Sequence, residues 1–432
     1  MINLTRIAEM SREDPKLVFT GIAQVINESL LKVCHTEMDP GKAVGIDDVT
    51  KSEYEKNLDE NIANLMNRIR TKEYRPKPAL RVNIPKDNGK TRPLNIYCYE
   101  DKLVQAALKK VLEAVFEPMF YDEMMGFRPK RSCHKAIGLL NRMIENNYTN
   151  YVLDCDIRGF FDHIQHEWCL KFIESRIKDP RILRLVSVML KAGIMQGMEL
   201  DPTEEGSGQG SICSPIIANI YMHYVLLWWF KERIVPELRG YAGIVIYADD
   251  FVVCFQHKDE AEKFYDRLRN RLKHFGLQIE EEKSRLIEFG RFAETNARKK
   301  GHAAETFTFL GFTHYCSKAR NGKFRVKRRT SSKKFKKKLK ELNIEICVRV
   351  KFQFPVKDLI DWLNNVLRGY YNYYAITDNS PMLGAFAFRV RRMLFKWLNR
   401  RSQRKSMNWV EFNEMLVKYP LVKWKLKNVY AM

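Results

Sequence analysis

Tyr247-Ala-Asp-Asp-Phe-Val-Val-Cys-Phe255 gives the clearest structural signal in this chain. Two adjacent acids separate the apolar residues 243–246 from the apolar residues 251–255, which predicts two strands joined at Asp249 and Asp250. A carboxylate pair at such a turn can point into a cleft without being desolvated inside a sheet. Turns with two Asp residues are also common in ordinary loops. The stretch alone therefore leaves a functional site and an ordinary turn both open.

A second acidic segment favours the functional site. Tyr151-Val-Leu-Asp-Cys-Asp156 predicts a short apolar strand, in which charges are costly unless they are paired or bind metal. If Asp156 faces Asp249 and Asp250, the three carboxylates can hold two Mg²⁺ ions, because Mg²⁺ prefers hard oxygen ligands. Two such ions can activate a 3′-hydroxyl and stabilise a pyrophosphate leaving group. Asp154 and Asp162 are interpreted as structural residues.

The balance of charge indicates a polyanionic partner. The 432 residues include 75 Lys and Arg against 52 Asp and Glu, a formal net charge of +23 at pH 7. A field of this sign attracts nucleic acid, although charge alone also allows a basic protein without such a partner. The nine cysteines are scattered without a CxxC pair, which favours a reducing cytoplasm and no structural zinc. The longest apolar run, residues 221–230, is too short to cross a membrane.

The order of helices and hairpins predicts an α+β fold with an antiparallel sheet. Apolar spacing predicts helices at residues 14–31, 47–70, 99–116, 214–234 and 260–275. Extended patterns predict strands at residues 80–85, 92–97, 151–157, 242–255 and 307–315. The composition changes at about residue 318, since residues 318–340 hold thirteen Lys or Arg and no acid. We therefore expect a domain boundary within residues 321–332.

Seven motifs follow one another in an order that resembles the reverse transcriptases. They are residues 86–93, Gly126-Phe-Arg-Pro-Lys-Arg-Ser-Cys-His134, residues 156–162, Gln209-Gly-Ser-Ile-Cys-Ser-Pro215, residues 247–250, residues 276–283 and Phe309-Leu-Gly-Phe312. More narrowly, the chain is similar to the bacterial group II intron reverse transcriptase and maturase family from about residue 4 onward. This likeness includes Leu367-Arg-Gly-Tyr-Tyr371 and Lys396-Trp-Leu-Asn-Arg-Arg-Ser-Gln-Arg404. One Tyr-x-Asp-Asp is a weak signal, whereas seven motifs in order are specific.

The resemblance implies a right-hand polymerase. Residues 1–45 would form an N-terminal extension, residues 46–318 the fingers and a palm with an antiparallel sheet, and residues 319–432 a helical, basic, maturase-like thumb. The implied activity is RNA-directed DNA polymerisation in a bacterial cytoplasm. The implied partners are template RNA, a DNA primer or product, dNTPs and a cognate structured RNA, and the implied cofactors are two Mg²⁺ ions, with Mn²⁺ as the alternative metal.

The resemblance also assigns roles near the three aspartates. Lys86 and Arg92 flank a basic hairpin tip and would bind the incoming triphosphate, with a solvated basic turn as the alternative. The backbone carbonyl of Ile157 would complete the metal site. Phe161 would be the steric gate against a 2′-hydroxyl, unless it and Phe160 are both core residues.

Further positions follow from the same resemblance. Gln209 and Gly210 would lie beside the nascent base pair, where glycine permits a close backbone approach. Lys283 would donate a proton to the leaving pyrophosphate, or be an ordinary surface lysine. Leu310 and Gly311 would form the primer grip. Five residues of the basic tract would bind RNA, with a solvated charged face as the alternative; they are Lys327, Arg328, Arg329, Lys333 and Lys334.

Some positions depart from the family pattern, and two other functions stay open. Ser207-Gly208 stands where Thr-Pro is common, and Asn95 and Lys130 each replace a usual Gly, which bears on intron splicing more than on polymerisation. One alternative is a freestanding antiphage-defence reverse transcriptase that copies a dedicated noncoding RNA. The other is an RNA-binding splicing factor with a vestigial polymerase site. The intact acidic triad argues against a vestigial site, because such charges repel one another without metal.

Overall fold

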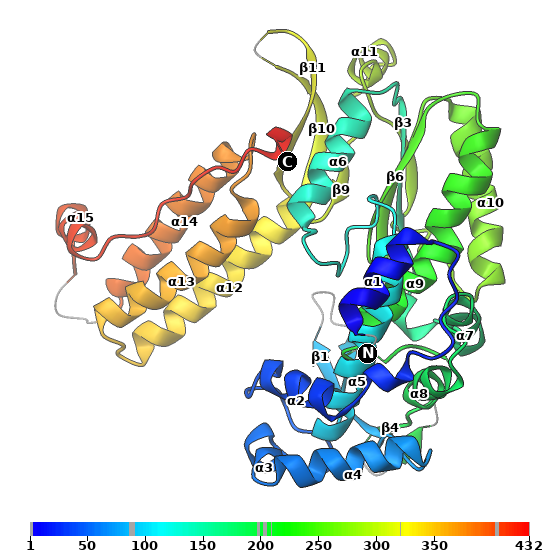
Figure 1. The fold of residues 1–432 in the computed structure, drawn as a ribbon. Coiled ribbons are helices and arrows are strands. Elements are labelled where there is room, and N and C mark those ends of the chain that lie inside the picture. Colours follow the sequence, from blue (N-terminus) through cyan, green and yellow to red (C-terminus); the bar gives the residue numbers. More distant parts are fainter. Residues whose placement is uncertain are drawn as a thin grey trace.

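A mixed body of helices and strands carries a projecting arm of helices (Figure 1). The structure, a computed structural model, describes residues 3–85, 91–196, 199–201, 205–208, 210–319, 321–401 and 406–431. Its helices and antiparallel sheets confirm the expected α+β class. In the described residues, no helix is long and apolar enough to cross a membrane.

A four-stranded antiparallel sheet lies at the centre of the body. Its strand order is β6-β7-β3-β8. The strands are β3 Tyr151–Asp156, β6 Ala242–Tyr247, β7 Asp250–Phe255 and β8 Arg285–Glu288. The strands expected at residues 151–157 and 242–255 are therefore confirmed, and the acidic pair lies where β6 turns into β7.

Both faces of this sheet are buried, which explains why its central strands read as continuous apolar runs. In β7, Phe251, Val253 and Phe255 join the core that contains helix α10 (Lys258–His274). The alternate residues, Val252 and Cys254, join the core that contains helix α6 (Cys133–Glu145). Because β7 packs on both of its faces, the position of its first residue, Asp250, is fixed.

Helices and a second sheet make up the N-terminal half of the body. Helix α5 (Tyr99–Phe116) is buried over most of its length, as its apolar sequence predicts. The other helices are α1 Leu4–Glu13, α2 Glu28–Glu37, α3 Lys51–Glu55, α4 Leu58–Arg70, α7 His166–Glu174, α8 Pro180–Leu190 and α9 Ser214–Met222, which continues through π-helical turns to Ile234. The sheet has the order β2-β1-β4-β5, with β1 Ala79–Pro85, β2 Thr91–Ile96, β4 Ile194–Gln196 and β5 Glu199–Asp201.

The helix expected at residues 14–31 is wrong. Helix α1 ends at Glu13, before Asp14-Pro15, because a residue that precedes proline is disfavoured in the helical conformation. Helix α2 begins only after Asn27, whose side chain accepts a hydrogen bond from the backbone N–H of Leu30. Between them the chain forms turns, bends and a short 3-10 helix (Ala23–Val25), and Phe19 forms a β-bridge with Ile177. Phe19, Ile22, Val25 and Ile26 are buried without forming an α-helix.

A three-stranded sheet joins the body to the arm. Its order is β11-β10-β9, with β9 Phe307–Phe309, β10 Phe312–Lys318 and β11 Phe324–Thr330, and the short helix α11 is Ala293–Lys299. Val326 of β11 lies in the same core as Phe307 and Phe309, whereas Phe335 lies in the separate core of the arm. The packing therefore changes near Ser331, the residue that caps the next helix. The predicted division at residue 318 stays a prediction.

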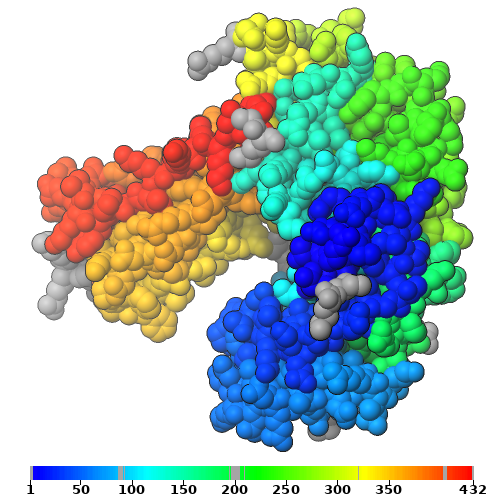
Figure 2. Space-filling view, in the orientation of Figure 1, coloured from blue at the N-terminus to red at the C-terminus, as the bar shows by residue number. Residues whose placement is uncertain are grey.

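The arm consists of four helices and a returning C-terminal segment. The helices are α12 Ser332–Lys351, α13 Val356–Tyr374, α14 Ser380–Leu398 and α15 Trp409–Lys418. The last residues run back to the body (Figure 1), where Val429 is buried against Ile137, Phe312 and Ile376. Figure 2 shows an open cleft between the arm and the N-terminal helices, bordered by the yellow and orange helices on one side and the blue ones on the other.

Candidate active site

The ends of two neighbouring strands bring the predicted carboxylates together. Asp156, the last residue of β3, is the register partner of Asp250, the first residue of β7. Directly opposed residues on antiparallel strands have Cα atoms about 4.5–5.5 Å apart. Asp249 directly precedes Asp250 in the turn. Three acids from two distant segments therefore meet at one edge of the sheet.

The turn that carries the acidic pair is tight and strained. Tyr247 pairs with Asp250 across it, so only Ala248 and Asp249 make the connection. Ala248 has a φ of 59°, a left-handed conformation that glycine adopts more readily. The backbone of Gly126 lies against this turn, since a Cβ built there would come within 2.5 Å of the backbone nitrogen of Ala248. Glycine at 126 thus lets a second loop support the acidic turn.

Burial and repulsion by neighbouring acids raise the pKa values of Asp250 and Asp154. Burial raises the pKa of Asp250 well above its usual range, and the charges of Asp154, Asp156 and Asp249 raise it further. Burial likewise raises the pKa of Asp154 to about 7, although Arg285 nearby acts in the opposite direction. Asp154 is therefore a fourth acid in the same electrostatic cluster. Carboxylates held together in this way have the donor chemistry of a divalent cation site.

A lysine supplies positive charge to this cluster. The Nζ atom of Lys283 lies 2.5 Å from Oδ2 of Asp156, and this hydrogen bond raises the pKa of the lysine. The segment that carries Lys283 runs along the end of β3, where the N–H of Glu280 donates to the carbonyl of Asp156. Among the described residues, no group of three or more His, Cys, Asp or Glu is arranged to hold a metal ion. In this structure the ammonium group of Lys283 pairs with Asp156.

The two adjacent phenylalanines differ in their surroundings. Phe160 is 1% exposed and packs in the core of the body. The alternative that both phenylalanines are core residues is therefore confirmed for Phe160. Phe161 is only partly buried, and its ring lies edge-on to Phe127, with centroids 6.4 Å apart. Ile157 follows Asp156 directly and is buried. Phe161 is thus the more exposed ring of this pair.

Two predicted nucleotide contacts, Lys86 and Gln209, lie outside the described residues. The backbone of Arg92 pairs with Ile84 in the β1–β2 hairpin, which confirms the expected hairpin. At Gly210 a Cβ would come within 2.3 Å of the carbonyl oxygen of Asn95. In this structure, Gly210 therefore permits the close approach of its own backbone to strand β2.

The predicted primer grip is a tight turn next to the acids. Leu310 and Gly311 join β9 to β10 with φ values of 49° and 77°. The backbone of Leu310 lies close enough to Asp250 to oppose the rise in the pKa of that carboxyl, although burial and the neighbouring acids outweigh it. The turn thus lies beside one predicted metal ligand.

The structure corrects one of the predicted RNA contacts. Arg328 is fully buried in strand β11, where its Nη2 atom lies 3.2 Å from Oδ2 of Asp378 and its guanidinium lies over the ring of Tyr430. It is a structural residue, because a buried group cannot reach RNA from the surface. By contrast, Arg329, Lys333 and Lys334 are exposed and Lys327 is half-buried.

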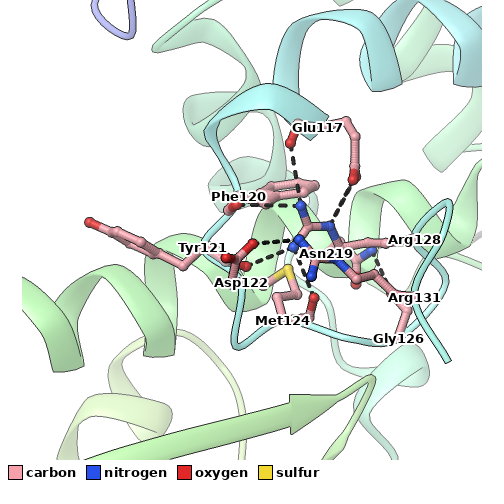
Figure 3. Close-up of polar contacts among 9 residues, drawn as sticks. All are labelled: Glu117, Phe120, Tyr121, Asp122, Met124, Gly126, Arg128, Arg131 and Asn219. Carbon is pink, nitrogen blue, oxygen red and sulfur yellow. Dashed lines mark hydrogen bonds and ion pairs between the residues drawn. The ribbon is translucent and has the colours of Figure 1, made fainter. Parts of the chain in front are cut away.

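Arg128, to which the sequence assigned no role, organises the loop that contains Gly126 (Figure 3). Its Nε atom donates to both carboxylate oxygens of Glu117 at 3.0 Å, and its Nη1 atom donates to the carbonyls of Tyr121 and Met124. Asn219 donates to the carbonyl of Gly126 at 3.0 Å. Arg128 belongs to the motif of residues 126–134, which could have indicated its importance. Only the fold shows that its side chain closes a loop.

Replacing Arg128 by lysine is expected to destabilise the protein by about 1–3 kcal/mol, the usual cost of leaving buried hydrogen-bond acceptors without a donor while the positive charge is kept. A lysine cannot reproduce the planar fork that reaches several carbonyls and a carboxylate at once. The measurement is urea unfolding followed by tryptophan fluorescence. Arg131→Lys, on the same loop but paired with the exposed Asp122, serves as the control. Equal stability of the two variants would show that the buried fork contributes little.

Comparison with known proteins gives the class of the molecule. The family model described as reverse transcriptase (RNA-dependent DNA polymerase) matches residues 84–314, and that of the group II intron, maturase-specific domain, matches residues 332–413. The group II intron-encoded protein LtrA of Lactococcus lactis subsp. cremoris is 27% identical, over 90% of this chain and 76% of its own length. Protein YkfC of Escherichia coli (strain K12) is 28% identical, over 74% of this chain and 90% of its own length. An uncharacterized 91 kDa protein in the cob intron of Schizosaccharomyces pombe is 39% identical over 38% of this chain and 20% of its own length.

The first match spans more than half of the chain, so the protein is a reverse transcriptase, a member of the RNA-dependent DNA polymerases. Because a maturase-specific domain follows, the chain belongs to the group II intron reverse transcriptase and maturase family. The predicted family and enzyme class are confirmed. Binding of template RNA and of intron RNA follows from the two domains.

Proposed function

We propose that this reverse transcriptase copies RNA into DNA at a two-metal site formed by Asp156, Asp249 and Asp250. The observation that supports this site most directly is the register of β3 and β7, which opposes Asp156 to Asp250. The family generally uses divalent metal ions, and the repelling carboxylates have the hard oxygen donors that Mg²⁺ prefers and that Mn²⁺ also accepts. The backbone carbonyl of Ile157 is the proposed fourth ligand.

When bound, the two ions supply activation of the primer 3′-hydroxyl and stabilisation of the pyrophosphate leaving group. The chain supplies orientation and charge around them. Lys86, Arg92 and Gln209 are proposed to bind the incoming nucleotide, and Lys283 to hold a proton at Nζ for the leaving group. The Lys283 ammonium is already beside Asp156, which supports a place for it at the reacting phosphates.

The proposed layout is a right hand. Residues 1–45 form an N-terminal extension, residues 46–318 the fingers and palm, and residues 319–432 a helical thumb. The central sheet and the separate helical core of the arm support this division. The cleft between arm and body (Figure 2) would hold the duplex of template RNA and DNA product, with dNTPs entering beside it.

The proposed biological role is that of an intron maturase in the bacterial cytoplasm. The protein would bind a specific structured intron RNA through its C-terminal domain, which matches the maturase-specific family model. The nine cysteines are free thiols, which suits a reducing compartment. A freestanding antiphage enzyme has no observation here in its favour. A vestigial site is disfavoured because four acids remain clustered.

Primer extension on an RNA template with Mg²⁺ tests the proposed site. The unmodified protein should extend the primer, and Asp249→Ala should abolish extension. Asp266→Ala, which removes an exposed acid of α10, is the matched control and should extend normally. Inactivity of the unmodified protein would support a vestigial site, and normal extension by Asp249→Ala would exclude these ligands.

Substituting Phe161 by alanine is expected to raise the incorporation of ribonucleotides relative to deoxyribonucleotides by about tenfold or more. The half-buried ring would no longer clash with a 2′-hydroxyl, and a lost steric contact of about 1–3 kcal/mol corresponds to such a factor. The measurement is the ratio of kcat/KM for one rNTP and its dNTP. Phe160→Leu, at the buried neighbouring residue, is the control: it should change the stability of the protein and leave this ratio unaltered. An unchanged ratio in Phe161→Ala would rule out the gate.

A further inference from the structure

A tyrosine of the arm reaches the turn that lies beside the catalytic acids. Tyr373 is near the end of α13, and its hydroxyl donates a hydrogen bond to the carbonyl oxygen of Leu310 at 2.8 Å. The Nε2 atom of His134 lies 2.7 Å from the carbonyl oxygen of Tyr373 itself. The ring of Tyr373 stacks on Phe312, with centroids 5.7 Å apart and planes 19° from parallel. The hydroxyl is therefore oriented by the stacking of the ring on Phe312 and by the hydrogen bond to the Tyr373 backbone.

The residue that accepts this hydrogen bond is held in an unfavourable conformation. Leu310 has a φ of 49°, which is uncommon for a residue with a branched side chain. Such a conformation persists only where the surroundings impose it. Its carbonyl accepts the hydrogen bond from Tyr373, and its backbone lies close enough to Asp250 to affect the pKa of that carboxyl. One strained peptide thus connects the arm to a predicted metal ligand.

A third segment meets at the same point. Burial raises the pKa values of both Tyr247 and Tyr373, and the neighbouring side chain of Cys133, the first residue of α6, raises them further. Tyr247 ends the strand that leads into the acidic turn. Cys133 therefore lies between the arm residue Tyr373 and the strand that carries the acidic turn.

The arm itself is fixed to the body by buried polar groups. Asn379, which is 0% exposed, accepts a hydrogen bond from the N–H of Thr330 and donates to the hydroxyl of Thr330 and the carbonyl of Tyr374. The hydroxyl of Tyr430 donates to Asp378 at 2.5 Å. Satisfied buried networks of this kind permit one arrangement and disfavour others. The position of Tyr373 relative to Leu310 is therefore set by the docking of the arm.

We propose that Tyr373 is a positioning residue of the polymerase site, whose hydroxyl holds the Leu310 turn in the geometry that supports Asp250 and seats the primer terminus. The polymerase site then depends on a group supplied by the thumb, and docking of the thumb completes it. This inference rests on the proposed roles of Asp250 and of the Leu310–Gly311 turn.

Tyr373→Phe tests the inference, because it removes one hydroxyl and leaves the ring. Single-nucleotide incorporation on an RNA template with a DNA primer should show a kcat about three- to tenfold lower, the effect of one lost neutral hydrogen bond. The KM for the dNTP and the Kd for template and primer should stay within about twofold of the unmodified values, since the binding surfaces are intact. The midpoint of thermal unfolding should stay within about two degrees. Tyr224→Phe removes a hydroxyl that bonds to Ser175 far from the site, and should leave kcat unchanged.

Testing Tyr373→Phe in a Leu310→Gly protein distinguishes a positioning role of the hydroxyl from a general loss of stability. Glycine adopts positive φ without strain, so a turn with Leu310→Gly no longer needs the hydroxyl to impose its conformation. In that background, Tyr373→Phe should lower kcat by less than about twofold. An equal loss in both backgrounds, or no loss in the Leu310 protein, would overturn the inference. Asp250→Asn is run in parallel: if it is inactive while Tyr373→Phe is fully active, only this inference fails, and if Asp250→Asn is active, the proposed site itself fails.

Discussion

Asp250→Asn is expected to abolish RNA-templated DNA synthesis and, without divalent ions, to make the folded protein more stable. The lost activity follows from the loss of a metal ligand, and a fall of at least about 10³-fold is expected because the removed interaction acts at the reacting centre. The gain in stability follows from the site's electrostatics. The buried Asp250 carboxylate is repelled by Asp154, Asp156 and Asp249. An isosteric neutral amide removes this repulsion, and a gain of about 1–3 kcal/mol is expected.

The metal-free protein is expected to become less stable as pH rises. The folded-state pKa of Asp250 lies well above its usual value of 3.8, so the folded protein binds a proton that the unfolded chain has released. Between the two pKa values, stability therefore falls as pH rises. The pKa of Asp154, raised to about 7, acts in the same direction. The unmodified protein in EDTA should lose stability between about pH 5 and pH 8, and Asp250→Asn should lose less.

Thermal unfolding in EDTA and primer extension with Mg²⁺ measure the two effects on the same preparations. Asp266→Asn, an exposed acid paired with Arg269, is the matched control and should change neither quantity. A variant that is inactive and also less stable would mean that Asp250 is a structural residue whose charge the fold requires. An active variant would remove Asp250 from the metal site.

Raising the monovalent salt concentration from about 50 to about 200 mM is expected to weaken RNA binding by about 10³–10⁵-fold, if six to ten phosphates are neutralised. The cations are available, because Arg329, Lys333 and Lys334 are exposed where β11 leads into α12. They lie at the start of the arm, whose first helix borders the cleft in Figure 2. Neutralised phosphates release counterions, and added salt opposes that release.

The measurement is the slope of log K against log salt, from filter binding of the cognate RNA. Replacing Lys333 and Lys334 together by glutamine should reduce the slope by about two, since each lost phosphate contact removes about one unit. Lys171→Gln, an exposed lysine of α7 paired with Glu167, is the control and should leave the slope unchanged. A flat salt response of the unmodified protein would count against phosphate contacts as the source of affinity.

The strands and the acidic cluster could be predicted because their signals are local. Two apolar runs separated by Asp249 and Asp250 specify a hairpin whatever surrounds it. The long helix over residues 99–116 was predictable for the same reason, since its apolar residues recur at helical spacing. The meeting of Asp156 with Asp250 was expected from the cost of an unpaired charge in an apolar strand and from the order of motifs, and the sheet register shows how it arises.

Other features depend on contacts between distant segments, which one sequence does not display. Arg328 looks like its neighbours in a basic tract, and only the approach of Asp378 and Tyr430 makes it a buried residue. The predicted helix at residues 14–31 failed because tertiary pairing of Phe19 with Ile177 outweighed a helical spacing of apolar residues. The contact between Tyr373 and Leu310 likewise required the arm to be docked.

Binding of Mn²⁺ tests the proposed metal site most directly. Electron paramagnetic resonance can count the ions held by the protein in complex with template RNA, a dideoxy-terminated primer and the next dNTP. Asp156→Asn should bind fewer ions than the unmodified protein, whereas Asp266→Asn should bind the same number. If Asp156→Asn holds as many Mn²⁺ ions, with the same affinity, as the unmodified complex, then the strand ends of β3 and β7 are not where this enzyme binds its metals.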